Sequence, residues 1–269
     1  MKTTDTLLFD AGNSRFKWAL VRDGHLGPQQ ACALGDFAQF ASWLRRAPAV
    51  ERVVGVNVAG ARLERQLRSA LHADKRPSPE LITSSAQGGR VTNGYARPLQ
   101  LGADRWAALV AAWHRAGCYR TVCAASIGTA ITLDLVDQDG YHRGGLIAPG
   151  PGLMLDALLD RTADIATHAA QATTGPRRGR IEPEHRLVPP LADATQAAID
   201  EGCLAAAAGF IDRTINQIKQ RLGVRPVLFV TGGASAQVVE RLRSACKPCD
   251  DLVLRGVAVL GEVPIRRRA

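Results

Sequence analysis

The stretch LLFDAGNSRFKWAL, residues 7–20, places two apolar segments on either side of a short polar turn. The first segment ends in Asp10, the turn contains Gly12-Asn13-Ser14, and the second segment carries Lys17. Glycine lets a ligand approach the backbone closely, and exposed N–H groups in such a turn bind phosphate oxygens. We interpret the stretch as a phosphate-binding β-hairpin, in which Asp10 holds magnesium on the phosphates and Lys17 adds positive charge. Taken alone, these residues also fit an ordinary hairpin.

Two later segments also combine an apolar strand with a glycine-containing turn. Residues 121–134 predict a second strand-turn-strand, with Gly128-Thr129 at its turn. Residues 227–234 predict a buried strand that ends in a turn of small residues, Gly232-Gly233, before a helix. Each segment therefore offers a glycine turn at the end of a strand, where a phosphate or a nucleotide can approach the backbone.

An acidic and a basic residue meet at the predicted start of another helix. Residues 101–106, LGADRW, place Asp104 directly beside Arg105. We interpret Asp104 as a general base, because a neighbouring cation keeps a carboxylate ionised. Asp104 fits equally well as the N-cap of the helix. Arg105 can bind a substrate carboxylate through two nitrogens, or it can form a salt bridge with a helix neighbour.

In their order along the chain, the four segments resemble the type III pantothenate kinases of the acetate kinase/sugar kinase/actin-like superfamily. The resemblance covers nearly the whole chain. It extends to Asn93-Gly94-Tyr95, to the glycine-rich turn Gly144-Gly145-x-Ile147-x-Pro149-Gly150, and to Arg161-Thr162-Ala163. It implies an α/β fold of two ribonuclease H-like (actin-like ATPase) domains, with the active site in the cleft between them. We expect the first domain at residues 1–116 and the second at residues 117–269.

The resemblance also implies a role for each motif. ATP is bound by the glycine turns and their neighbours, which are Asp10, Gly12, Asn13, Ser14, Lys17, Gly128, Thr129, Gly232 and Gly233. Asp104 is the catalytic base, and pantothenate is bound by Tyr95, Gly102, Ala103, Arg105 and Thr195. The implied reaction moves the γ-phosphoryl group of ATP to the terminal hydroxyl of pantothenate. Its product is 4'-phosphopantothenate, in the first step of coenzyme A synthesis. Magnesium at Asp10 and a homodimer, with the substrate site near its interface, complete the expectation.

The chain departs from the family pattern at Ser126. The family usually carries Asp-x-Gly-Thr-Ala where this chain has Ser126-Ile127-Gly128-Thr129-Ala130. By resemblance, the missing aspartate is a ligand for a monovalent cation, potassium or ammonium. A serine hydroxyl is neutral and binds such an ion more weakly, so we expect a weaker or less selective response to potassium. A second departure is Ala194, where an asparagine usually precedes Thr195.

Strand and helix patterns alternate along the chain, which argues for α/β layers. Largely apolar runs predict strands at 6–10, 16–22, 52–58, 121–125, 131–136, 227–231 and 252–254. Helical patterns occupy 36–46, 61–73, 104–116, 152–161, 194–220 and 235–245. A phosphate-turn hairpin opens each half, so we expect one architecture used twice. Residues 173–190, rich in arginine and proline, predict a mobile loop.

Composition indicates a globular protein. The 269 residues are 46% hydrophobic and 22% charged, which suffices for a sizeable core. Asp10 interrupts the early apolar run, which is unlike a signal peptide, and no segment approaches the roughly 18–20 apolar residues of a membrane span. We therefore expect a soluble cytoplasmic protein with free thiols. Cys246 and Cys249 have C-x-x-C spacing, but no second pair or nearby histidine completes a zinc site. A surface turn before the final strand is preferred there over zinc or a redox pair.

The net charge of +9 suits an anionic ligand such as ATP. It also leaves nucleic acid open as a partner, although 5% aromatic residues offer no stacking platform and no DNA-binding motif accompanies the charge. Two alternatives to the pantothenate kinase interpretation follow. One is a different small-molecule kinase of the superfamily. The other is a non-catalytic regulator that binds nucleic acid or protein through its basic surface. The presence of Asp10, Lys17 and Asp104 favours an enzyme.

Overall fold

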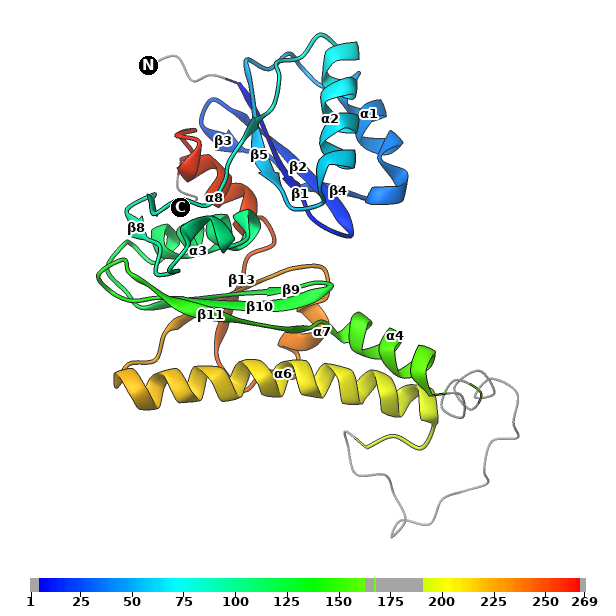
Figure 1. The fold of residues 1–269 in the computed structure, drawn as a ribbon, viewed down its shortest axis with the longest axis vertical. Helices are drawn as coiled ribbons and strands as arrows, with labels where there is room; N and C mark the ends of the chain where they lie inside the picture. The colour runs from blue at the N-terminus through cyan, green and yellow to red at the C-terminus, as the bar shows by residue number, and fades with distance from the viewer. Residues whose placement is uncertain (1–4, 163–166, 168–190, 267–269) are drawn as a thin grey trace.

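The computed structural model describes residues 5–162, 167 and 191–266. Within these residues the chain forms two main β-sheets, with helices between the sheets and on their outer faces (Figure 1). None of the described helices is long and apolar enough to cross a membrane. The loop predicted at 173–190 lies outside the described residues.

The first sheet has the strand order β3-β2-β1-β5-β6, with β4 paired to β2. Its strands are β1 (Thr6–Ala11), β2 (Arg15–Arg22), β3 (His25–Leu26), β4 (Gln30–Ala33), β5 (Arg52–Asn57) and β6 (Glu80–Leu81). β2 runs antiparallel to β1, whereas β5 pairs parallel with β1. Strand β1 is buried throughout because helices cover both of its faces. The outer face packs against α1 (Ala38–Leu44) and α2 (Ala61–Ala73), around Phe16 and Phe40.

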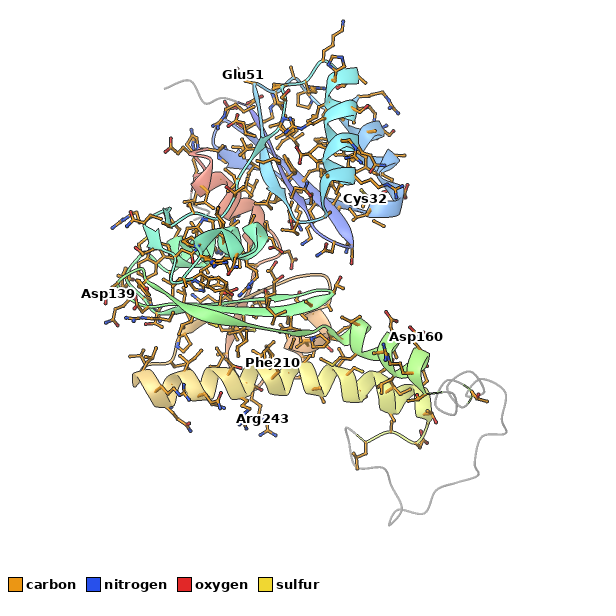
Figure 2. The ribbon with its side chains drawn as sticks, in the orientation of Figure 1. Cys32, Glu51, Asp139, Asp160, Phe210 and Arg243 are labelled. Atoms are coloured by element: carbon orange, nitrogen blue, oxygen red, sulfur yellow. The ribbon has the colours of Figure 1, made fainter. Side chains whose placement is uncertain are left out.

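The second sheet repeats this topology, with the order β11-β10-β9-β12-β13. Its strands are β9 (Val122–Ile127), β10 (Ala130–Val136), β11 (His142–Pro149), β12 (Val227–Thr231) and β13 (Cys246–Pro248). Again an antiparallel hairpin is followed by parallel strands, so the prediction of one architecture used twice is confirmed. The outer face packs against α4 (Pro151–Arg161), α6 (Thr195–Leu222) and α7 (Ser235–Val239). Figure 2 shows Phe210 on the side of α6 that faces this sheet.

Helices α3 (Ala103–Arg115) and α8 (Leu252–Leu260) form a layer between the two sheets (Figure 1). One core cluster joins residues of both sheets to these helices, including Leu8, Trp106, Phe229 and Leu254. At the helix crossing, a Cβ added to Gly256 would lie 1.8 Å from the carbonyl oxygen of Ala107, so only glycine permits this approach. The C-terminal helix α8 thus packs on β1 of the first sheet, and the division at residues 116 and 117 stays a prediction.

The other elements are short. They are η1 (Leu34–Asp36), β7 (Gln87–Gly88), β8 (Val91–Thr92) and η2 (Pro98–Gln100). The segment from β7 to η2 leads directly into α3 and carries the Asn93-Gly94-Tyr95 motif. It therefore delivers the predicted substrate residues to the beginning of that helix.

Two predictions of local structure are wrong. The final strand expected at 252–254 is helix α8, which is apolar nearly all round because it is buried between two sheets. A short apolar run does not by itself separate a helix from a buried strand, and its valines favoured the strand. The glycine-rich turn expected at residues 144–150 is mostly strand β11, an edge strand paired with β10. Glycine weakens the interior of a strand, and where it occurs it often marks a site that another group approaches closely. This is the case for Gly145, next to Asp134 and Arg105.

The predicted turn at the C-x-x-C motif is also wrong. Cys246 belongs to β13, and Cys249 is buried, with its Sγ donating a hydrogen bond to Oδ1 of Asp251 at 3.3 Å. The predicted helix at 235–245 ends at Val239, and a turn leads on to β13. All six cysteines are free thiols, as expected.

Candidate active site

The two predicted phosphate turns meet. The hydroxyl oxygens of Ser14, in the β1–β2 turn, and Thr129, in the β9–β10 turn, lie 2.6 Å apart. Both turns are tight: the N–H of Gly12 donates to the carbonyl of Arg15 at 3.1 Å, and the N–H of Gly128 to that of Ala130 at 3.0 Å. Residues 115 positions apart in the sequence therefore lie in contact, which the sequence could indicate only through the motifs themselves.

Asp10 lies near the end of β1 and is almost completely buried. Burial raises its pKa to about 6; the positive charge of Lys17 opposes this shift, and the charge of Asp104 adds to it. The Lys17 Nζ lies 3.5 Å from Oδ2 of Asp10, on the neighbouring strand. Oδ1 is buried and has no hydrogen-bond partner among the described residues. An inward-facing carboxylate oxygen without a partner fits a magnesium ligand.

Magnesium is compatible with this single carboxylate. The described part of the chain holds no group of three or more histidine, cysteine or acidic side chains that could bind a metal. Magnesium does not need such a group, because it is usually bound by one or two carboxylates together with substrate phosphates and water. The turn that follows Asp10 also contacts the second glycine turn through Ser14 and Thr129.

Asp104 occupies the first turn of α3, while Gly102 is the N-cap residue. The alternative in which Asp104 caps the helix is therefore wrong. Burial raises the pKa of Asp104, and the N–H of Arg105, which donates to Oδ1 at 2.8 Å, opposes this shift. A Cβ on Gly102 would lie 2.8 Å from Oδ1, so the glycine leaves room for the carboxylate. The charge of Asp104 in turn adds to the rise in the pKa of Asp10.

Arg105 is buried, and its partner is not a helix neighbour. Its Nε and Nη2 donate to the two carboxylate oxygens of Asp134, in β10, at 2.9 and 2.7 Å. Its Nη1 donates to the hydroxyl of Tyr95 at 3.2 Å. All three guanidinium nitrogens thus donate within the protein, two of them to Asp134. Only Nη1 does not donate to Asp134, and it lies beside the Tyr95 hydroxyl.

Asp134 and His142 are site residues that sequence reasoning missed. His142 Nε2 lies 3.1 Å from Asp134 Oδ1, and the His142 ring stacks on Tyr95 with centroids 5.5 Å apart. Asp134 does carry a signal in retrospect, since it interrupts the apolar strand that follows the second phosphate turn. His142 carries none, because its partners come from other segments of the chain.

Ser126 belongs to a row of hydroxyl side chains. It is the register partner of Thr132 in β10 and of Thr231 in β12, so the three residues occupy neighbouring positions on one face of the second sheet. Asp134 lies two residues beyond Thr132 on the same face, but Arg105 and His142 occupy its carboxylate. No carboxylate stands in the row itself, which agrees with the departure noted in the sequence.

The third glycine turn lies against the other two. Gly232 has a φ of +108°, and a Cβ there would lie 2.2 Å from the carbonyl oxygen of Ile127, so other residues are excluded. A Cβ on Gly233 would lie 3.7 Å from Nη1 of Arg15 in the first hairpin. The structure therefore brings the predicted adenosine turn close to both phosphate turns.

Thr195 is the predicted site residue that the fold places elsewhere. It begins α6, which covers the face of the second sheet opposite to α3. It lines an open apolar groove of about 790 Å³ between α4 and α6, together with Leu153, Met154, Leu158 and Ile199.

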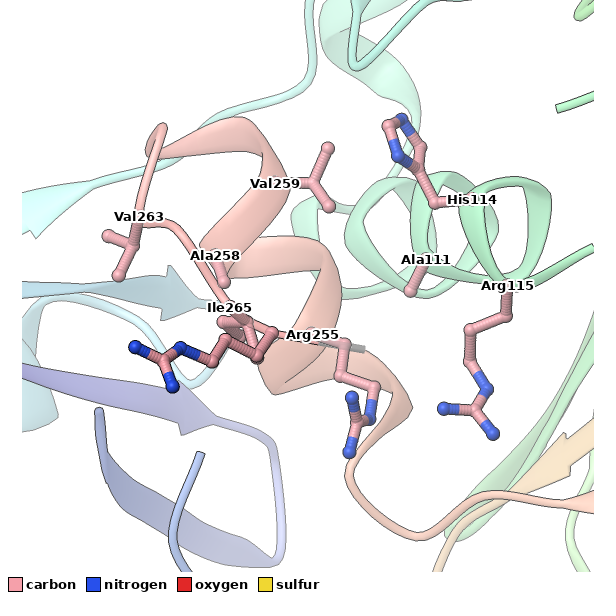
Figure 3. A pocket seen from close by; sticks show the side chains of 9 residues that line it. Ala111, His114, Arg115, Arg255, Ala258, Val259, Val263 and Ile265 are labelled. Atoms are coloured by element: carbon pink, nitrogen blue, oxygen red, sulfur yellow. The ribbon is translucent and has the colours of Figure 1, made fainter. Parts of the chain in front are cut away.

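A further cavity, of about 280 Å³, lies between α3, α8 and the C-terminal segment, away from the glycine turns (Figure 3). Three arginines line it, Arg115, Arg255 and Arg266. Arg255 forms a two-nitrogen salt bridge with Asp251, and Arg115 lies over the ring of Phe229 at 6.0 Å. These two guanidiniums are thus partnered within the protein, and none of the predicted site residues lines the cavity.

Comparisons with known proteins cover nearly the whole chain. The family model described as type III pantothenate kinase matches residues 6–217. Proteins named type III pantothenate kinase from Aromatoleum aromaticum and Herminiimonas arsenicoxydans are 37% and 38% identical to it, covering 94% and 93% of this chain and 96% and 95% of theirs. Component A of the Acidaminococcus fermentans (R)-2-hydroxyglutaryl-CoA dehydratase matches with a TM-score of 0.51 at 14% identity, over 96% of each chain. With the repeated sheet topology, this likeness confirms the predicted two-part actin-like fold.

Proposed function

The chain belongs to the type III pantothenate kinase family, and we propose that its cleft transfers the γ-phosphoryl group of ATP to the terminal hydroxyl of pantothenate. It is a kinase that acts on pantothenate in coenzyme A biosynthesis. The observation that carries the proposal is the contact between the glycine turns of both halves, where the Ser14 and Thr129 hydroxyls lie 2.6 Å apart, next to the buried carboxylate of Asp10.

Phosphate binding is assigned to the turns. The N–H groups around Gly12-Asn13-Ser14 and Gly128-Thr129 would bind phosphate oxygens, and the turn at Gly232-Gly233 would lie against the adenosine. Asp10 would hold magnesium through Oδ1, and the ion would neutralise charge on the phosphates when bound. Lys17 adds a positive charge 3.5 Å from the same carboxylate.

Proton transfer is assigned to Asp104. The hydroxyl oxygen of pantothenate attacks the γ-phosphorus, the bond to the β–γ bridging oxygen breaks, and ADP leaves with that electron pair. Asp104 takes the hydroxyl proton. Burial raises its pKa, and a general base works best when its pKa approaches the working pH. The contribution of its charge to the raised pKa of Asp10 supports a base close to the phosphates.

Substrate binding is assigned to the segments around α3. Tyr95 and Arg105 would contact the pantothenate carboxylate through the phenol hydroxyl and Nη1, which lie 3.2 Å apart. The backbone of Gly102 and Ala103, at the beginning of α3, would line the site beside the base. This arrangement replaces the expected two-nitrogen contact of Arg105 with the substrate, because Asp134 occupies the other side of the guanidinium.

The quaternary structure that fits Thr195 is a homodimer. Apolar side chains of α4 and of edge strand β11 are exposed, among them Leu146, Ile147, Leu153 and Leu158. A second copy covering this face would remove them from water, and it would allow Thr195 to contribute to the partner's substrate site. We place the reaction in the cytoplasm, where ATP is supplied. The row of hydroxyl side chains at Ser126 supports only a weak dependence of activity on a monovalent cation.

A phosphoryl-transfer assay tests the function. Purified protein with ATP, magnesium and pantothenate should release ADP and a phosphorylated product of matching mass. Asp104→Asn should lose at least about 100-fold in kcat, which excludes a contaminating kinase. Absence of product from the folded wild-type protein would favour a non-catalytic regulator. Turnover of a sugar or acetate instead of pantothenate would point to another kinase of the superfamily.

A further inference from the structure

Four side chains from four segments form one polar cluster beside the proposed base. Arg105 comes from α3, Tyr95 from the loop before it, Asp134 from β10 and His142 from β11. We call these four residues the Arg105 cluster. Arg105, Asp134 and His142 are 7%, 2% and 0% exposed, so their contacts form away from bulk water. Hydrogen bonds between charged groups in such surroundings are stronger than exposed ones.

Asp134 is the centre of the cluster. It accepts three hydrogen bonds, two from Arg105 and one from His142. Both Asp134 oxygens accept from N–H groups of Arg105, so we assign His142 Nε2 as a third donor to this carboxylate. The other ring nitrogen, Nδ1, is buried and has no hydrogen-bond partner in the described parts of the chain. The histidine therefore contributes a single hydrogen bond and the ring stack on Tyr95.

The backbone leaves space for these contacts. Gly145 is the register partner of Asp134, and a Cβ there would lie 2.1 Å from Asp134 Oδ1 and 2.6 Å from Arg105 Nη2. A Cβ on Gly94 would lie 1.9 Å from the carbonyl oxygen of His142. Two glycines, one on each side, thus allow the loop, the helix and the strands to approach. Such close approach marks a built arrangement rather than a chance ion pair.

We propose that Asp134 and His142 are positioning residues that set the substrate specificity of the site, an inference that rests on the proposed function. Asp134 fixes the Arg105 guanidinium so that Nη1 faces the substrate, and His142 fixes the ring of Tyr95 beside it. Together, Nη1 and the phenol hydroxyl then present two fixed donors to one carboxylate group. A fixed arginine loses less conformational entropy on binding than a free one.

The experiment compares two substrates that differ only at the recognised group. These are pantothenate and its alcohol analogue, in which CH₂OH replaces the carboxylate. Asp134→Asn keeps the shape but removes the charge that fixes Arg105. We expect KM for pantothenate to rise about tenfold or more, the scale of a charged hydrogen bond, while KM for ATP changes less than about twofold. For the alcohol analogue, KM should change by less than about threefold.

A second variant tests the histidine without leaving a charge unpaired. His142→Phe keeps the ring on Tyr95 and removes only the hydrogen bond to Asp134, and no partner of Nδ1 is lost among the described residues. It should keep the melting temperature and raise KM for pantothenate about threefold to tenfold. The matched control is Asp137→Asn, which removes a buried carboxylate of the same hairpin that pairs with Arg143 instead of Arg105.

The outcomes separate the inference from the function it rests on. Equal loss with both substrates, loss of kcat at constant KM, or no change in either variant would overturn the positioning role. The same pantothenate-specific effect in Asp137→Asn would also overturn it. If wild-type protein turns over neither substrate, the proposed function itself fails, whereas normal wild-type turnover with insensitive variants rejects only the inference.

Discussion

Asp10 should support catalysis by binding magnesium, and its burial should at the same time lower the free energy of unfolding. Its pKa rises from 3.8 to about 6 on folding, mainly through burial. Between these two values the folded state binds more protons than the unfolded state, so stability falls as pH rises and the full penalty is present above about pH 6. A shift of about two units corresponds to a penalty of about 3 kcal/mol, of which roughly half develops between pH 5 and pH 8.

Asp10→Asn removes this penalty because the amide does not ionise. In the absence of metal and nucleotide, the free energy of unfolding of the variant relative to wild type should increase by about 1.5 kcal/mol from pH 5 to pH 8. For a chain of this size, that is a relative rise in melting temperature of about 3–5 °C. The attraction of Lys17 is already contained in the shifted pKa of Asp10, so loss of this salt bridge adds no separate pH-dependent contribution.

Thermal melts in a chelating buffer at both pH values measure this difference. Asp139→Asn is the matched control, because Asp139 is exposed in the β10–β11 turn (Figure 2), and its melting temperature should show no such pH trend relative to wild type. Magnesium and ATP should then stabilise wild type but not Asp10→Asn, by about 2.7 kcal/mol for a ligand at a hundred times its Kd. A pH-independent difference between Asp10→Asn and wild type would refute the argument that Asp10 is desolvated. Equal stabilisation of both proteins by magnesium-ATP would refute its role as a metal ligand.

Three further predictions concern other parts of the site and the fold. Asp104→Asn should bind magnesium-ATP normally by calorimetry but lose about 10²–10⁴-fold in kcat, and near-normal turnover would leave Asp104 as a positioning residue. Gly256→Ala should lower stability by about 1–3 kcal/mol or more in denaturant titration, because its Cβ meets the Ala107 carbonyl at 1.8 Å. Gly209→Ala, in open space on α6, should instead stabilise by about 0.5–1 kcal/mol, and equal effects of the two would contradict the close helix crossing. Ser126→Asp should strengthen activation by potassium over sodium at constant ionic strength, whereas strong potassium-only activation of wild type would show that the hydroxyl row suffices.

The sequence pattern predicted those elements whose structure depends on residues close together in the chain. The two hairpins, their turns and the buried parallel strand β12 follow from short apolar runs interrupted by glycine. Helix α8 was missed because its composition, a short apolar run rich in valine, is also typical of a buried strand. Strand β11 was missed for a related reason, since its glycines serve the packing of other residues rather than a turn.

The site residues also divide into those that a sequence motif identifies and those that only the folded structure reveals. Asp10, Lys17 and Asp104 belong to motifs, and their surroundings were foreseeable from the residues next to them in sequence. Arg105 also belongs to a motif, but its partner Asp134 is 29 residues away. No periodicity links the two positions, so only the packing of α3 on β10 reveals that one side of the guanidinium is occupied. The expected two-nitrogen contact with a substrate failed for that reason.

The glycines of the motifs acquire a physical meaning only in three dimensions. Gly102 leaves space for the carboxylate of Asp104, Gly145 for the pair of Asp134 and Arg105, and Gly232 for the backbone at Ile127. None of these glycines needs to touch a ligand to matter, because a methyl group at each position would displace a neighbouring residue. Such a substitution should act on the orientation of the neighbour, and therefore on the kinetic constant that the neighbour controls: kcat for Gly102, KM for pantothenate for Gly145, and nucleotide affinity for Gly232. In this fold, a glycine pattern thus records where functional side chains and backbone come into close contact.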